Sequence, residues 1–143
     1  MSGPLDLQLA EAEVLSLHAE GADWWLRLST AWVRPGPQAP EGGWTHPLRL
    51  RLQQAQRLDP ASSRPLPPGN GDWLGRLREA RLGRPAAAAG GWRWQASLPL
   101  PGHVAGPLRL ELDFAHGSVL HLHLAGLDCD WAGEAGLRPA WQC

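Results

Sequence analysis

The sequence predicts an all-β protein, either an antiparallel β-barrel or a two-sheet sandwich of about seven or eight strands. Apolar and polar residues alternate over five separate segments, as they do in strands that bury one face and expose the other. The segments between them are rich in proline and glycine, which end strands because proline has no backbone N–H to donate. The five alternating segments are residues 24–32, 48–52, 92–98, 108–114 and 120–124.

Two further segments have less regular patterns. Residues 5–18 alternate but also place apolar residues at helical spacing, and we interpret them as two short strands or one bulged strand. Residues 73–82 are expected to form another strand. One short helix is the alternative there, because Asp72 and Gly83 resemble helix caps.

The length fits a single β domain that spans residues 1–143. A chain of this size buries roughly 68–70% of its unfolded surface, so its core needs no metal or disulfide. The two cysteines, Cys129 in an apolar run and Cys143 at the last position, form neither a disulfide framework nor a zinc site. We expect Cys129 to be a buried, inert thiol and the protein to use no cofactor.

The charge balance argues against attraction to polyanions. Thirteen basic residues, all arginine, stand against 14 acidic ones, and the formal net charge is -1, so neither nucleic acid nor a membrane is an expected partner. The exclusive use of arginine is attributed to GC-rich coding in a bacterial genome. The densest basic run, from Arg76 to Arg84, also contains Glu79 and predicts a solvated face. The first residues carry no signal-peptide pattern, so the cytoplasm is the expected compartment.

The leucine stripes constrain the pairing of the last two alternating segments. If both stripes face the core, Leu112 should lie opposite Leu122, with a loop of three residues at 116–118. This register places Asp113 opposite His121 on the outer face. A similar argument for a turn at Glu20–Gly21 pairs Leu17 with Trp24 and His18 with Asp23.

The sequence His121-Leu122-His123 is the one feature that invites chemistry, because alternate residues of a strand point the same way. The pair is similar to the metal-binding His-x-His of the cupin family, in which a carboxylate ligand follows, and Asp128 stands five residues after His123. The similarity covers about a dozen residues and lacks the glycine and the second-motif histidine of that family. It implies a small metal-dependent enzyme that uses His121, His123 and either Asp128 or Asp113. The favoured interpretation is solvent-facing histidines paired with carboxylates across the strands, with Glu111 opposite His123.

Other catalytic constellations are missing from the sequence. There is no G-x-S-x-G elbow, no phosphate-binding G-x-x-x-x-G-K-[ST] and no G-x-G-x-x-G. The complete lack of lysine excludes a Schiff-base mechanism. We therefore expect a protein that is not an enzyme.

Tryptophan is abundant, with nine residues in the chain. Four of them are in phase with leucines and are expected in the core: Trp24, Trp32, Trp92 and Trp94. Trp25 falls out of phase, whereas Trp44, Trp73 and Trp141 occupy loop or terminal positions. There they could bind a ligand or partner, although capping the ends of the core is the favoured interpretation.

Three functions remain open at this point. The first is a small non-catalytic binding or interaction protein of the bacterial cytoplasm, which contacts a protein or small molecule through Trp44, Trp73, Trp141 and the proline-rich loops. The second is the cupin-like enzyme. The third is a carrier of an apolar small ligand inside the barrel, which requires an interior void.

Overall fold

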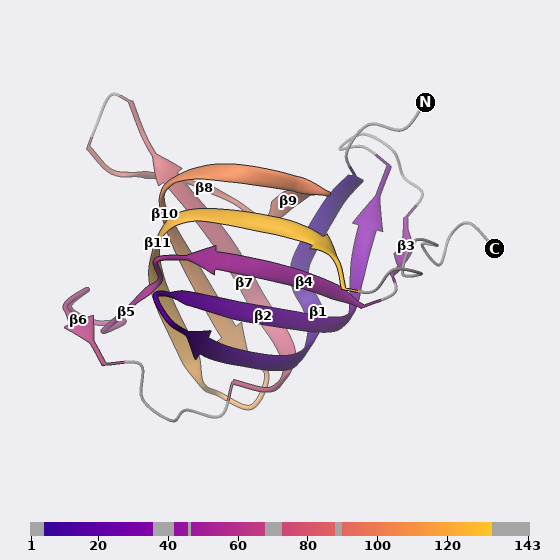
Figure 1. Cartoon of the computed structure of the whole chain (residues 1–143), viewed down its shortest axis with the longest axis horizontal. Helices are drawn as coiled ribbons and strands as arrows, with labels where there is room; N and C mark the ends of the chain where they lie inside the picture. The colour runs from indigo at the N-terminus through magenta and orange to yellow at the C-terminus, as the bar shows by residue number, and fades with distance from the viewer. Residues whose placement is uncertain (1–4, 36–41, 46, 68–72, 88–89, 133–143) are drawn as a thin grey trace.

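A computed structural model describes residues 5–35, 42–45, 47–67, 73–87 and 90–132 (Figure 1). All regular structure within these ranges is β, which confirms the predicted fold class, and the helix considered for residues 73–82 does not form. The strands are β1 (Leu5–Glu20), β2 (Asp23–Arg34), β3 (Gly43–Trp44), β4 (Leu48–Gln53), β5 (Gln56–Leu58), β6 (Pro65–Leu66), β7 (Gly75–Pro85), β8 (Trp92–Gln95), β9 (Ser97–Leu100), β10 (Gly102–Phe114) and β11 (Val119–Trp131).

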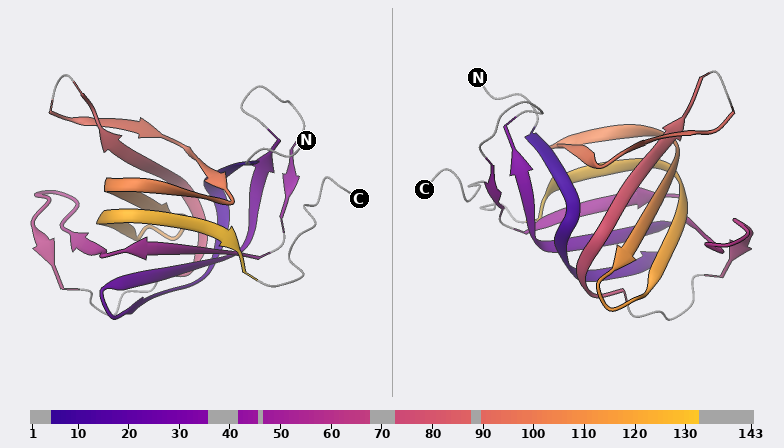
Figure 2. Two further views of the ribbon diagram at one scale, coloured as in Figure 1. Left: turned by 45° about the horizontal axis from the view of Figure 1, so that its top comes forward. Right: turned by 180° about the vertical axis from the view of Figure 1, so that it is seen from behind.

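Six of these strands close into an antiparallel barrel. Around the barrel the order is β1, β2, β4, β11, β10 and β7, and β7 pairs again with β1 (Figures 1 and 2). The short strands extend this wall: β9 continues beside β1, β5 beside β11, β3 beside β2 and β8 beside β7, while β6 pairs only with β5. Of the two predicted architectures, the structure is therefore the barrel.

Alternation along the six strands fills the barrel with apolar side chains. Most inward positions are leucine and have close to no solvent exposure, and Phe114 is the largest fully buried side chain. Burial of one leucine stabilises the folded state by roughly 1.5–3 kcal/mol. Among the buried leucines are Leu7, Leu26, Leu28, Leu48, Leu50, Leu52, Leu77, Leu82, Leu108, Leu110, Leu112, Leu120, Leu122 and Leu124.

Strand β1 is one bulged strand, which is one of the two forms that the sequence predicted. Its register with β2 shifts between Gln8 and Glu13, and Glu11 at the bulge has a φ of 69°. The bulge separates two halves of β1 that have different partners, because residues 5–8 pair with β9 and Glu13 and Val14 pair with β7. One long strand thereby helps to close the barrel.

Three of the four tryptophans expected in the core are not there. Trp24 is buried, but Trp32, Trp92 and Trp94 are only partly buried. Trp32 points outward because the buried positions of β2 change phase after Leu28, to Ala31 and Val33.

Trp94 lies on the outer side of β7, where its ring covers Gly83. A Cβ atom added at Gly83 would lie only 3.0 Å from the Trp94 ring, so the ring occupies the space of the missing side chain. Strand β7 also continues past Gly83 to Pro85, and there its partner is β8. The alternation in residues 92–98 was therefore a correct sign of strands, but it did not identify the inner face.

Both predicted hairpin registers are wrong by two residues. Leu112 pairs with Leu120, and Glu111 instead of Asp113 lies opposite His121. Four residues, 115–118, lie between the two strands instead of the predicted three, and Phe114 N–H donates to the carbonyl of Ser118. A shift of two leaves every side chain on its face, so the hydrophobic pattern does not distinguish the two registers.

The turn residues decide between these registers. Gly117 has a φ of 106° and Gly21 a φ of 65°, in the left-handed region that glycine enters without strain. With Gly21 in the turn, Glu20 pairs with Asp23, so Leu17 lies opposite Leu26 and His18 opposite Trp25. Arg109, and not Glu111, is the partner of His123.

Truncation of an inward leucine tests the filled interior. We expect Leu122→Ala to lower the free energy of unfolding by about 2–5 kcal/mol, because the surrounding strands can collapse only partly around the lost volume. Urea unfolding followed by tryptophan fluorescence measures the change. The matched control is Leu15→Ala, since Leu15 is 53% exposed and its truncation should cost less than about 0.5 kcal/mol. Equal losses in the two variants would contradict the inward assignment.

Candidate functional site on the outer wall of the barrel

The chemically active side chains lie outside the barrel. Because apolar residues fill the inside, polar residues occupy the alternate, outward positions of the same strands. Two hollows in the described part of the chain are lined by such residues.

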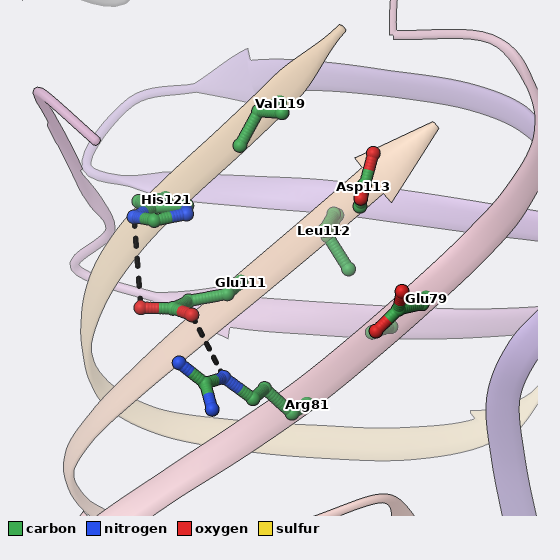
Figure 3. Close-up of a pocket in the computed structure, with 8 residues that line it drawn as sticks. Glu79, Arg81, Glu111, Leu112, Asp113, Val119 and His121 are labelled. Atoms are coloured by element: carbon green, nitrogen blue, oxygen red, sulfur yellow. Dashed lines mark hydrogen bonds and ion pairs between the residues drawn. The ribbon is translucent and has the colours of Figure 1, made fainter. Parts of the chain in front are cut away.

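The first hollow, here named the Glu111 pocket, has a volume of about 260 Å³. It lies over β7, β10 and β11, which are neighbours in the barrel wall (Figure 3). Its lining residues are Glu79, Ala80, Arg81, Glu111, Leu112, Asp113, Val119 and His121.

Glu111 is the centre of a network of polar contacts in this pocket. Strand register places it between Arg81 on β7 and His121 on β11 (Figure 3). Its carboxylate lies 2.8 Å from Arg81 Nε, 3.1 Å from Arg109 Nε and 3.6 Å from His121 Nδ1. Arg81 also lies over the Trp94 ring, 3.8 Å from the ring centroid. Since the Glu111 side chain is only 15% exposed, these contacts hold it in one position.

Arg109 joins His121 to the loop that follows β5. Its Nη1 donates to Ser63 Oγ at 2.9 Å, and its Nη2 lies 3.3 Å from His121 Nδ1. Burial lowers the pKa of His121, and the positive charges of Arg109 and Arg81 lower it further, whereas Glu111 acts in the opposite direction. His121 is therefore neutral at pH 7, and its Nδ1 accepts the Arg109 hydrogen bond.

Two carboxylates face each other at the other end of the pocket. Asp113 lies opposite Glu79, and a register shift in this part of β7 places Arg78 and Glu79 on the same outer side. Arg78 Nη2 donates to Asp113 Oδ2 at 2.7 Å. Asp113 Oδ1 is buried without a hydrogen-bond partner among the described residues. Arg78 therefore neutralises only part of this like-charge pair.

The structure does not bring the three proposed metal ligands together. His121 and His123 both lie on the outer face, but Asp128 is five residues further along β11, or about 16 Å of strand. Asp128 instead contacts His103 Nδ1 at 2.5 Å and accepts a hydrogen bond from Gln53 at 2.7 Å. No group of three or more His, Cys, Asp or Glu residues in the described ranges could hold a metal ion.

The three tryptophans singled out from the sequence have different environments. Trp73 is 8% exposed and belongs to the core, 6.0 Å from the Phe114 ring. Trp44 is 44% exposed and packs edge-on against Trp32, with 5.3 Å between the ring centroids. Trp141 lies outside the described residues, as does Cys143. Cys129 is buried, and burial raises the pKa of its thiol, as expected of an inert cysteine.

The second hollow, here named the Trp25 hollow, was not found from the sequence. It has a volume of about 350 Å³ and lies over β1, β2 and β4. The one signal in the sequence was that Trp25 falls out of phase with the leucines. The sequence does not show that the arginines beside Trp25 come from another strand, so it did not predict the hollow. The lining residues are His18, Glu20, Trp25, Arg27, Arg49 and Ala132.

Comparison with known proteins assigns neither a family nor a function to this chain. No protein-family model, no curated protein and no solved structure matches this chain. Separately, no helix within the described ranges is long and apolar enough to cross a membrane.

The lowered pKa of His121 predicts how stability depends on pH. Below the ordinary histidine pKa of 6.5 the unfolded chain binds a proton that folded His121 does not, so the free energy of unfolding should fall as the pH is lowered through this range. We expect His121→Asn to make this dependence shallower. Urea unfolding at several pH values between about 5 and 8 measures it.

The matched control for this prediction is His18→Asn, because the His18 side chain is 53% exposed. It should leave the wild-type pH dependence in place. If the unfolding free energy of His121→Asn depends on pH as steeply as that of the wild type, His121 is not held in its neutral form.

Proposed function

We propose that this chain is a non-catalytic binding protein that holds its ligand or partner on the outer wall of the barrel. The observation that carries the proposal is the contrast between the two sides of the same strands. Inward positions are buried apolar residues, most of them leucine, whereas outward positions supply fixed polar groups and two hollows. The β-strands hold these groups in place before a ligand arrives, which reduces the entropy lost on binding.

The Glu111 pocket is poorly suited to catalysis. The Glu111 carboxylate is already paired with Arg81 and Arg109, and the lone pair of His121 Nδ1 accepts from Arg109. A general base needs a free lone pair within reach of the substrate. The residues that line the pocket include no serine, threonine or cysteine, so a hydroxyl or thiol nucleophile is missing from its wall. The Asp113 carboxylate is already bound to Arg78 through Oδ2.

The two alternative functions find less support. A metal-dependent enzyme needs ligands that converge, and His123 and Asp128 lie at separate places along β11 with different partners. A carrier of an apolar ligand needs an empty interior, and the inward leucines are packed against one another at almost zero exposure.

Apolar probes test whether the interior can accept a ligand. We expect benzene and indole to leave the melting temperature of the wild-type protein unchanged and to raise that of Leu122→Ala. The variant has an apolar cavity that such molecules fill, and binding to the folded state alone stabilises it. Thermal unfolding with and without each probe measures the effect. A wild-type response as large as that of the variant would favour the carrier over our proposal.

Mapping by nuclear magnetic resonance tests the outer wall directly. We expect small polar compounds that bind to shift backbone amide signals of outward residues such as Arg81, Glu111 and Arg49, and to be recovered unchanged after incubation. Glu111→Gln keeps the size of the side chain and removes its charge, so it should alter binding at the Glu111 pocket only. Signal shifts confined to inward residues, or turnover of a bound compound, would overturn the proposal.

A further inference from the structure

Two arginines face each other across β2 and β4 on the outer wall. Arg27 on β2 lies directly opposite Arg49 on β4, and both side chains are exposed. Like charges in directly opposed positions destabilise a strand pair. Neither arginine makes an ion pair or a hydrogen bond within the described ranges. Arg51, the next outward residue of β4, differs because its Nε donates to Asp23 at 2.8 Å.

Trp25 helps to orient one member of this pair, Arg49. The guanidinium of Arg49 lies over the Trp25 ring, 5.2 Å from its centroid, and that of Arg51 lies 6.0 Å away. Such cation–π contacts orient a guanidinium without neutralising it. The positive charge of Arg49 therefore remains available beside that of Arg27, at the wall of the Trp25 hollow.

Two acidic residues on adjacent strands have other contacts. Glu20 on β1 is 3.7 Å from His18. Asp130 on β11 lies opposite Arg49 in the register, but its Oδ1 accepts the backbone N–H of Trp131 at 2.7 Å. Neither carboxylate forms an ion pair with Arg27 or Arg49 among the residues that the structure describes. The hollow therefore has two guanidinium groups in its wall that no described carboxylate pairs with, although Glu20 also lines it.

We propose that the Trp25 hollow binds the anionic group of a small ligand, a phosphate or a carboxylate, between Arg27 and Arg49. Guanidinium groups match both anions through paired N–H donors, and an anion placed between two of them removes their repulsion. The volume of about 350 Å³ suits a small organic molecule. The inference rests on the proposed binding function and names a ligand class and a site for it.

Another facing pair of arginines provides an internal comparison. Arg84 on β7 lies opposite Arg93 on β8, and both are exposed. Neither of these residues lines the Glu111 pocket or the Trp25 hollow. If coding bias alone placed arginines opposite each other, the two pairs should respond to anions in the same way.

Titration with pyrophosphate and, separately, with citrate tests the inference and distinguishes the two anion chemistries. Sodium chloride keeps the ionic strength constant, and the side-chain N–H signals of Trp25, Arg27 and Arg49 report binding. We expect saturable shifts with at least one of the two anions. Arg27→Gln and Arg49→Gln should each weaken binding about tenfold, whereas Arg84→Gln should change it less than about twofold.

These variants should fold like the wild type, because each one removes a repulsive charge from an exposed position. Arg27→Gln should melt at or above the wild-type temperature without added anion, and pyrophosphate or citrate should raise its melting temperature less than that of the wild type. The absence of saturable shifts up to about 10 mM of either anion, or equal weakening by Arg84→Gln, would overturn the inference. Polar compounds that still shift signals at the Glu111 pocket in that case would leave the proposed binding function standing.

Discussion

Closure of six strands into a barrel is the constraint on which the rest of this structure depends. An eight-stranded barrel is just wide enough for side chains to fill, so a barrel of six strands leaves still less room inside. Apolar side chains at the inward positions, most of them leucine, fill that room. Polar side chains that could recognise another molecule are consequently found on the outside, and the pleated wall presents them in rows. This is why the two hollows are formed between side chains of neighbouring strands instead of at the mouth or in the interior of the barrel.

Bulges allow a few long strands to close the barrel and also to carry its extensions. β1 changes partner from β9 to β7 across the bulge near Glu11. A bulge bends and twists a strand, which a sheet of so few strands needs in order to close. The same irregularities change which residues face outward. In β7 they place Arg78 and Glu79 together opposite Asp113, and this gives the Glu111 pocket its charged end.

The sequence was sufficient to predict the fold class, because alternation over many strands indicates a buried face whichever strands are neighbours. It was insufficient for register, since a shift of two residues preserves the faces and only the backbone conformation of Gly21 and Gly117 selects the pairing. Alternation also does not say which face is inward, so Trp94 was placed in the core although it covers Gly83 from outside. The histidines were correctly placed on the outer face. Their partners, and the meeting of Arg27 with Arg49, depend on pairings between strands that no local pattern specifies.

The two regions of the outer wall should respond differently to salt and ligands. In the Glu111 pocket the central charges compensate one another at distances of 2.8 and 3.1 Å, so an added ion would have to displace a partner that is already in place. At the Trp25 hollow, Arg27 and Arg49 repel each other, and any anion that enters gains attraction while it removes that repulsion. The same apolar core lies behind both regions, so it does not explain the difference in their response to anions. Electrostatics within one wall thus separates a pocket whose charges mainly fix its shape from a hollow whose charges favour an anionic ligand.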